Sequence, residues 1–325
     1  MPAVTVEDLL VLPRLPRLDA TAIDRPVRRL VTAPQQREGA GFLVHRPFPS
    51  AALPDADPFL LLDHVGETVY QPYEAKGAPW HPHRGFETVT YVIDGTVVHH
   101  DSNGGGGVIS DGDTQWMTAG SGILHDEVPS EEVLAKGGLS HGIQLWVNLP
   151  RTRKWAQPRY QDVRADKLRL LTSDDGGALV RLIAGGLGGY QGPGVTYTPI
   201  VYAHASLLPQ AQLRTGWDPQ FSAMVYVLQG AGSVGADRRP VGDGQLAVFG
   251  AGDVLTVQAG AHQRGRTGRF EVLLLGGVPL REPIARYGPF VMNTEAEIRQ
   301  AVEDYQQGRK PPPRPSSISG IAGAT

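Results

Sequence analysis

The chain has 325 residues, with 30 basic and 33 acidic side chains, and therefore a formal net charge of −3 at pH 7. This balance excludes the strong basic field that non-specific nucleic-acid binding requires. The absence of cysteine excludes disulfides, thiolate metal ligands and cysteine nucleophiles. The length is about twice that of a common domain, so we expect two domains.

The first twenty residues lack the basic and apolar regions of a signal peptide. No apolar run approaches the ~18 residues that a membrane span requires. We therefore expect a cytoplasmic protein without membrane contact. Glycine (41 residues) and proline (27 residues) are frequent and scattered along the chain, which indicates many turns between short strands. The composition thus favours an all-β fold.

Two β-branched runs between residues 87 and 100 flank the dipeptide Asp94-Gly95. Asp-Gly between such runs favours a type I′ turn, so we expect a hairpin here. The glycine-rich stretch 103–107 follows. It lacks a subsequent Lys-Ser or Lys-Thr, so we interpret it as a connection between strands and not as a phosphate-binding loop.

A buried strand is predicted at residues 144–149, where Pro150 ends it. Near the C-terminus, Thr294 and Glu297 form a capping-box pattern, and apolar residues follow at helical spacing, which predicts a helix. Residues 311–325 are rich in Pro, Ser and Gly and are predicted to be disordered. Further strands are predicted at residues 179–183, 198–203, 223–228, 245–249, 254–258 and 270–275.

The two halves of the chain contain an internal repeat. Residues 86–95 align with residues 221–230, and Gly112-Asp113 aligns with Gly252-Asp253. Two similar small β-barrels in tandem explain this order. We therefore expect a first, metal-binding barrel at residues 1–150, a linker at 151–175, and a second barrel with the C-terminal helix at 176–310.

Two short motifs carry the chemistry. His81 and His83 are separated by one residue, so in a strand both imidazoles point to one face, and Pro82 between them places the strand at a sheet edge. His125 and Glu127 repeat this spacing. On facing strands, the two pairs would bring three imidazoles and one carboxylate together around a divalent metal ion.

Such a ligand set restricts the metal and its chemistry. Neutral imidazole suits iron, nickel, copper and zinc, and one carboxylate shifts the preference toward the harder ions. Four protein ligands around an octahedral ion leave two positions open, unlike a closed structural site. A dication with one carboxylate has a net charge of +1, so we expect it to attract an anionic oxygen ligand.

The internal repeat provides a control for this interpretation. The alignment places Gly216 and Asp218 opposite the first histidine pair, and Gly265 and Thr267 opposite the second pair. His262 lies nearby without a partner pair. We therefore expect the second barrel to be metal-free.

Other residues compete for a role at the site. Glu87 follows His83 by four residues and shares its face, so strand alternation alone does not separate Glu87 from Glu127 as the fourth ligand. His99 and His100 are adjacent, so only one of them can face inward. The remaining candidates are expected to be structural or to line an apolar pocket: His64, His141, Trp80, Trp116 and Trp146.

The segments His81–Tyr91 and Gly112–Glu127 resemble hallmark stretches of the pirin family, whose members contain two cupin domains. Residues 144–150 and 287–294 share this resemblance, which extends over roughly residues 20–310. It implies two tandem cupin barrels of the jelly-roll type with a C-terminal helix. It also implies that the metal ligands are His81, His83, His125 and Glu127, with Glu87 outside the ligand set.

Pirin-like proteins are associated with two kinds of function. Some have quercetin 2,3-dioxygenase activity, which opens a flavonol ring with O2 and releases carbon monoxide. For this chain, that activity implies a planar aromatic substrate, O2, and Glu127 as a catalytic base. The expected metal is Fe(II), with Ni, Cu, Mn, Co or Zn as alternatives.

Other pirin-like proteins are iron-containing regulators that bind a transcription factor or a metabolic enzyme. This alternative implies a protein partner, an iron-dependent redox response and no direct contact with nucleic acid. A purely structural metal is the third possibility. The family resemblance does not choose among these roles.

Overall fold

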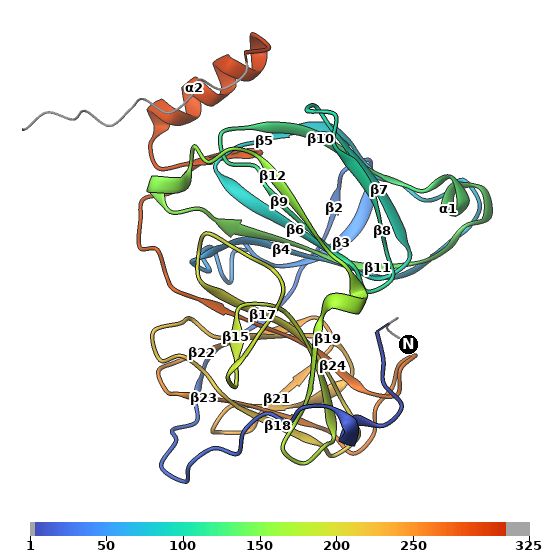
Figure 1. Cartoon of the computed structure of the whole chain (residues 1–325), viewed down its shortest axis with the longest axis vertical. Helices are drawn as coiled ribbons and strands as arrows, with labels where there is room; N and C mark the ends of the chain where they lie inside the picture. Colours follow the sequence, from blue (N-terminus) through green and yellow to red (C-terminus); the bar gives the residue numbers. More distant parts are fainter. Residues whose placement is uncertain (1–3, 310–325) are drawn as a thin grey trace, which may run out of the picture.

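The protein consists of two β-barrels stacked along the long axis of the molecule (Figure 1). A computed structural model describes residues 4–309. Each barrel pairs a seven-stranded sheet with a four-stranded sheet. Neither α-helix within residues 4–309 is long and apolar enough to cross a membrane. The pairing of a seven-stranded and a four-stranded sheet in each half confirms the prediction of an all-β fold with two tandem barrels.

In the first barrel, the two sheets face each other across an interior cavity. Its four-stranded sheet contains, in spatial order, β5 (Ala78–His83), β10 (Ile123–Pro129), β7 (Thr96–Asp101) and β8 (Gly106–Ser110). Its seven-stranded sheet contains β12 (Arg159–Val163), β9 (Thr114–Thr118), β6 (Phe86–Asp94), β11 (Gly138–Asn148), β4 (Phe59–Tyr70), β3 (Phe42–Phe48) and β2 (Gln35–Glu38).

The second barrel repeats this strand order. Its four-stranded sheet contains β18 (Gln212–Gly216), β23 (Val254–Ala259), β20 (Ala231–Val234) and β21 (Arg239–Gly242). Its seven-stranded sheet contains β1 (Val27–Thr32), β22 (Gln245–Phe249), β19 (Met224–Gln229), β24 (Phe270–Gly277), β17 (Ile200–Leu207), β14 (Ala178–Ala184) and β13 (Arg169–Thr172). The strands predicted in this half are thus confirmed, with small differences at their ends.

Short elements complete the chain. The pairs β15 (Gly186–Leu187) with β16 (Tyr190–Gln191) and β25 (Ala285–Tyr287) with β26 (Phe290–Met292) form small ribbons. The α-helices are α1 (Glu131–Lys136) and α2 (Glu295–Gln306), and single 3₁₀ turns lie at Leu9–Val11, Arg151–Arg153 and Ala165–Lys167. Thr294 caps α2 as predicted, because its hydroxyl accepts a hydrogen bond from the backbone N–H of Glu297.

The predicted hairpin at Asp94-Gly95 is wrong in its pairing. Both runs are strands, β6 and β7, but β6 pairs with β9 and β11, whereas β7 pairs with β8 and β10. Gly95 has a φ of +107°, a backbone conformation that side-chain-bearing residues rarely adopt, and the chain turns there from one sheet of the barrel to the other. The hydrophobic pattern of the sequence predicts where the strands lie but not which strands pair with each other.

The predicted domain boundaries also need correction at both ends. β1, which the prediction placed in the first barrel, pairs with β22 of the second. The segment from β25 to α2 returns to the first barrel, where Phe290 forms a β-bridge with Arg84 and α2 lies next to β5 (Figure 1). The predicted linker contributes β12 to the first barrel and β13 to the second. The predicted disordered segment 311–325 lies outside the described residues.

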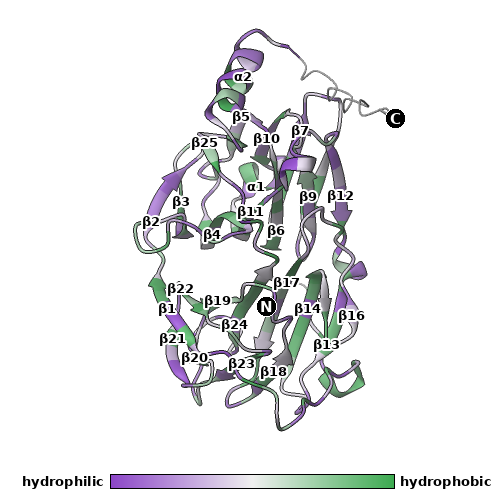
Figure 2. Cartoon of the chain, turned by 90° about the vertical axis from the view of Figure 1, so that its left-hand side faces the viewer, coloured by the Kyte–Doolittle hydropathy of each residue, from purple (hydrophilic) through white to green (hydrophobic). Residues whose placement is uncertain are grey.

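A continuous hydrophobic core joins the two barrels. Side chains from both seven-stranded sheets pack in one cluster, which includes Trp116 and Leu145 of the first barrel and Tyr202 and Leu273 of the second. Figure 2 shows β14 predominantly hydrophobic, whereas β2 and β12 are hydrophilic. The two seven-stranded sheets therefore form the interface between the barrels, and the four-stranded sheets face away from it.

Candidate metal centre

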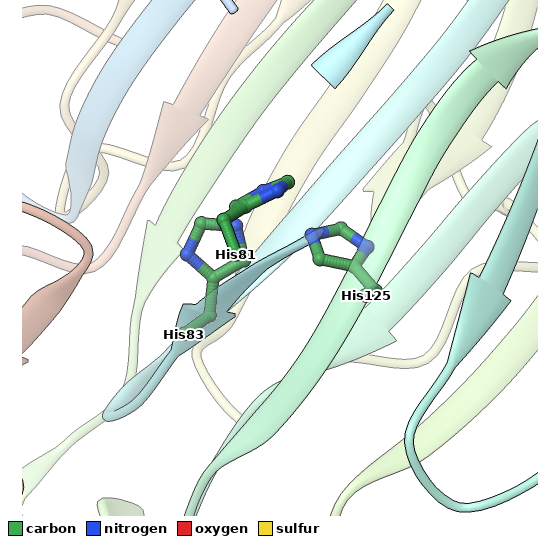
Figure 3. A group of neighbouring side chains, drawn as sticks. All are labelled: His81, His83 and His125. Atoms are coloured by element: carbon green, nitrogen blue, oxygen red, sulfur yellow. The ribbon is translucent and has the colours of Figure 1, made fainter. Parts of the chain in front are cut away.

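Three imidazoles meet inside the first barrel. His81 and His83 lie on β5, which is an edge strand as predicted, and His125 lies on the neighbouring strand β10, directly opposite His81. One ring nitrogen from each residue lies within 4.8 Å of the others. Figure 3 shows the three rings turned toward one another from the two strands. Strand alternation thus produces the shared face that the sequence predicts.

The hydrogen bonds of these rings leave nitrogens available for a metal. The Nδ1 atom of His81 lies 2.7 Å from the carbonyl oxygen of Pro79, to which it donates, so the lone pair resides on Nε2. Within residues 4–309, Nδ1 of His83 and both ring nitrogens of His125 are buried without a hydrogen-bond partner. Buried polar atoms normally have partners, so this arrangement fits a bound cation.

Burial also keeps the imidazoles of His83 and His125 neutral. The pKa of His83 is well below its usual value, first because of burial and then because of the neighbouring His125 and His81. Burial, followed by the charge of His81, lowers the pKa of His125 to about 3. A neutral imidazole offers its lone pair to a divalent transition metal at physiological pH.

Glu127 lies on the same interior face but outside the group of three histidines. An irregularity in the β5–β10 pairing places Glu127 opposite Ala78. The hydroxyl of Thr90 on β6 donates to Oε1 of Glu127 at 2.9 Å, so the carboxylate reaches across the barrel. Glu127, His81 and His83 line the same cavity. Its role as the fourth ligand remains a prediction and requires the side chain to turn toward the imidazoles.

Glu87, the competing carboxylate, is held elsewhere. Its side chain is fully buried and accepts hydrogen bonds from the hydroxyls of Thr118 and Thr196, each at 2.7 Å. Burial raises the pKa of Glu87, although these hydrogen bonds oppose the rise. Since Thr196 precedes β17 of the second barrel, Glu87 connects the two barrels and lies apart from the three histidines.

The site opens into a cavity of about 610 Å³. This volume lies within the ~300–1,000 Å³ that is typical of small-molecule sites. Trp80 and Trp146 contribute to its wall, whereas Trp116 is fully buried in the core between the barrels. Arg286 of β25 also lines the cavity, with its guanidinium 5.2 Å from the ring centroid of Trp146.

The other histidines of the first barrel have identifiable environments. His64 and His141 form a buried pair with their Nε2 atoms 2.9 Å apart, and Nδ1 of His64 lies 3.1 Å from the hydroxyl of Tyr226 in the second barrel. This pair fits the structural role that the sequence suggested. His99 faces the barrel interior and His100 faces outward.

The second barrel carries no ligand-type side chains at the matching positions. Strand order equates β5 with β18 and β10 with β23, and counting onward from Gly112 before β9 and Gly242 before β22 places Leu255 and Val257 where the first barrel has His125 and Glu127. Leu255 pairs with Thr215 as His125 pairs with His81, so Thr215 and Trp217 stand for His81 and His83, and all four replacements are buried. An apolar core occupies the place of the metal centre.

The predicted counterparts are therefore wrong, by one residue for the first pair (Gly216 and Asp218) and by ten for the second (Gly265 and Thr267), although they too lack imidazoles. The repeat was aligned on Gly252-Asp253, whereas Gly242-Asp243 precedes β22 in the way that Gly112-Asp113 precedes β9. The ten-residue error at the second pair arises because two Gly-Asp pairs lie close together in the second half.

Several residues of the site had no signal in the sequence. Thr90 binds the Glu127 carboxylate from the opposite sheet, and Gln144 lies beside Thr90 with its amide oxygen 2.6 Å from the hydroxyl. Arg286 reaches the cavity from a segment about 200 residues beyond the histidine pair. Only the folded chain brings these groups together.

Comparisons with known proteins agree with this architecture. The family model described as Pirin matches residues 41–147, and the model described as Pirin C-terminal cupin domain matches residues 202–311. Pirin-like protein 2 of Arabidopsis thaliana is 38% identical over 292 residues, which cover 88% of this chain and 86% of that protein.

Two relatives are named for an activity. A Pseudomonas aeruginosa protein, provisionally named as a quercetin 2,3-dioxygenase, is 44% identical over 255 residues, or 78% of this chain and 86% of that protein. A crystal structure of quercetin 2,3-dioxygenase from Acinetobacter baumannii superposes with a TM-score of 0.81 and 36% identity, covering 87% of this chain and 97% of that one. The chain, with its two barrels and its group of three histidines, belongs to the pirin family.

Proposed function

We propose that this protein is a metal-dependent dioxygenase that opens the ring of a flavonol-like substrate with O2, in the manner of quercetin 2,3-dioxygenase. The observation that carries the proposal is the group of three imidazoles, His81, His83 and His125, whose nitrogens lie within 4.8 Å of one another beside a cavity of about 610 Å³. The relatives named for this activity support it.

The proposed ligand set consists of these histidines and Glu127. A bound divalent metal, Fe(II) first and Ni, Cu, Mn, Co or Zn as alternatives, would polarise the deprotonated hydroxyl of the substrate and assist its reaction with O2. The protein would hold the imidazoles in the required tautomers, as the Pro79 carbonyl does for His81. Burial would keep water from competing for the site.

Glu127 is the candidate catalytic base. Its carboxylate lines the cavity and accepts a hydrogen bond from Thr90. A carboxylate at this place can accept the proton of a flavonol hydroxyl, and the Thr90 hydroxyl would orient it. Glu127 would thus act both as a ligand and as the proton acceptor.

The cavity wall fits a flat, anionic substrate. Trp80 and Trp146 offer aromatic surface, and Arg286 supplies a positive charge. Within the described residues, Arg286 donates one hydrogen bond, to the carbonyl oxygen of Leu60, and forms no ion pair with a carboxylate. The guanidinium is therefore free to attract a deprotonated phenol or another anionic group.

Anaerobic mixing with quercetin tests this proposal. Protein purified without affinity metals is first analysed for its metal content and then fully loaded. We expect quercetin to shift its visible absorption on binding and, once air is admitted, to be consumed with O2 uptake and release of carbon monoxide. The His125→Ala variant should lose both signals, whereas His262→Ala, on the exposed surface of the second barrel, should retain them. An unchanged spectrum with metal-loaded wild-type protein would refute the proposal.

An iron-dependent regulatory role is the second candidate. Trp80 directly precedes His81, and 52% of its surface is exposed, so a change at the metal can reach the molecular surface. This role predicts a protein partner that binds the Fe(II) and Fe(III) forms differently, with little turnover of flavonol. Equal binding of the partner to the Fe(II) and Fe(III) forms would contradict this regulatory role. A cytoplasmic location is part of both proposals.

A further inference from the structure

His99 is a buried histidine of the first barrel without an assigned role. It lies on β7, directly opposite Glu127 of β10, and only 2% of its surface is exposed. Side chains on directly opposite residues of neighbouring strands have their Cβ atoms about 5 Å apart. His99 and Glu127 therefore occupy one stretch of the barrel interior.

Two contacts define the orientation of the His99 ring, and the first of them also defines its tautomer. Nδ1 lies 2.8 Å from the amide nitrogen of Gln115, and the ring packs on Tyr160 with centroids 4.8 Å apart. The same Gln115 nitrogen lies 3.5 Å from Oδ1 of Asp162, which supports its assignment as the donor. Because an amide nitrogen only donates, Nδ1 of His99 accepts and its proton resides on Nε2.

The Nε2–H group of His99 has no hydrogen-bond partner within the described residues, although it is buried. Leaving a buried donor unpaired destabilises a protein, and an apolar side chain would fill the same space without this penalty. Burial lowers the pKa of His99, and the nearby Glu127 carboxylate opposes this shift more than any other neighbouring charge. The unpaired donor therefore belongs to a residue directly opposite Glu127, whose carboxylate accepts a hydrogen bond from Thr90.

We propose that His99 is a positioning residue for Glu127: its Nε2–H donates to the carboxylate oxygen that does not bind the metal. This inference rests on the proposed ligand role of Glu127. When Glu127 turns toward the three imidazoles, it gives His99 the missing acceptor. The hydrogen bond fixes which carboxylate oxygen faces the metal and favours the ionised ligand. Gln115 acts through His99, because it determines which ring nitrogen carries the proton.

Titration of the metal-free full-length protein with Co(II), in competition with a chromophoric chelator, tests this assignment. The His99→Leu variant should bind Co(II) about 10- to 100-fold more weakly, which is typical of losing an outer-shell partner, and its visible Co(II) bands should shift. His99→Gln retains an N–H donor and should recover most of the affinity. The control is His100→Leu on the outer face of the same strand, which should match wild type.

A second variant keeps His99 in place, in case its replacement disturbs folding. In Gln115→Glu, the new carboxylate accepts from Nδ1, so the proton moves from Nε2 and the donor toward Glu127 is lost. The Co(II) affinity should fall as in His99→Leu. In a Glu127→Gln background, His99→Leu should have little further effect, since its action passes through Glu127.

The outcomes separate this inference from the proposed function. Co(II) affinity and spectra equal to wild type in both His99→Leu and Gln115→Glu would overturn the role of His99 and leave the metal centre intact. Failure of wild-type protein to bind Co(II) would overturn the metal centre and, with it, the role of His99. Thermal unfolding of the metal-free variants shows whether a loss of affinity reflects a loss of fold.

Discussion

Arg84 and Asp304 form a buried ion pair, with Nη1 of the arginine 2.9 Å from Oδ2 of the aspartate, across 220 residues of sequence. Arg84 directly follows His83 of the metal centre, and Asp304 lies on α2. The backbone beside this pair is also fixed, since the N–H of Val291 donates to the carbonyl of Arg84 at 3.0 Å. The C-terminal segment thus supports the end of the strand that carries two of the three histidines.

Removing the carboxylate of this pair should destabilise the protein and the metal centre together. We expect Asp304→Ala to lower the free energy of unfolding by about 3–5 kcal/mol, because it leaves the Arg84 cation buried without its partner. The metal affinity should also fall, since the end of β5 loses its support. Urea unfolding and metal titration measure the two effects. The control Glu303→Ala, at the exposed neighbouring position, should change neither the stability nor the metal affinity. Equal stability of the Asp304→Ala and Glu303→Ala variants would contradict a supporting role for the Arg84–Asp304 pair.

The features that depend on neighbouring residues could be predicted from the sequence. Strand alternation places His81 and His83 on one face, and the Thr294 capping box starts α2, because both effects act within a few residues. The tandem barrels followed from the internal repeat and the frequent turns. Recognition of the two histidine motifs then indicated the family.

The features that depend on distant pairing could not be predicted. Nothing near Gly95 indicates that the chain changes sheets there, and nothing near β1 reveals its partner β22. The side chain of Glu87 is held by Thr196, which lies more than one hundred residues away in the sequence. Alternation alone therefore left the two glutamates equivalent, and only the fold separates their environments.

Matched substitutions of these two glutamates test the ligand assignment. Glu127→Gln should weaken metal binding by more than the ~10–100-fold that loss of an outer-shell partner produces, because an anionic ligand is removed. Glu87→Gln should leave metal affinity unchanged, since Thr118 and Thr196 hold that side chain away from the imidazoles. Competition titrations with a chelator compare the two variants. A larger loss of affinity in Glu87→Gln would reverse the assignment.

His204 should make the stability of the protein depend on pH. Burial, followed by the charge of Arg181, lowers the pKa of His204 in the second barrel to about 4. Between pH 4 and pH 6.5 the unfolded chain therefore binds more protons at this residue than the folded chain. The stability contribution is complete above pH 6.5 and is lost as the pH falls toward 4, with a slope of up to about 1.4 kcal/mol per pH unit.

Urea unfolding of the metal-free protein at pH 7.5, 6.5 and 5.5 measures this dependence. His204→Gln should be less stable at neutral pH, because Tyr91 and Glu271 lose a hydrogen-bond partner, but its stability should fall less steeply below pH 6.5. The control His262→Gln changes an exposed imidazole and should follow the wild-type curve. If the stability of His204→Gln and of wild type fell equally steeply below pH 6.5, His204 would not be the source of the pH dependence.

Arg286 should determine how strongly the cavity prefers anionic ligands. Burial and then the nearby Arg46 cation lower the pKa of Arg286, so a bound anion would relieve an unfavourable charge. Arg286→Gln should weaken anaerobic binding of quercetin by about 1.5 kcal/mol, or roughly tenfold, the contribution of one hydrogen bond to a charged group. Flavone lacks the ionisable hydroxyls of quercetin, so its binding should change little.

The control for this prediction is Arg281→Gln, an exposed arginine of the same segment outside the cavity wall. It removes the same net charge and should leave quercetin binding unchanged. Binding of quercetin to wild-type protein should also weaken as salt is added, because ions screen the attraction. If Arg286→Gln and Arg281→Gln weakened quercetin binding equally, net charge alone would explain the effect. If Arg286→Gln bound quercetin as wild type does, the substrate would lie away from this wall of the cavity. Its anionic group would then be held only at the site of the three histidines.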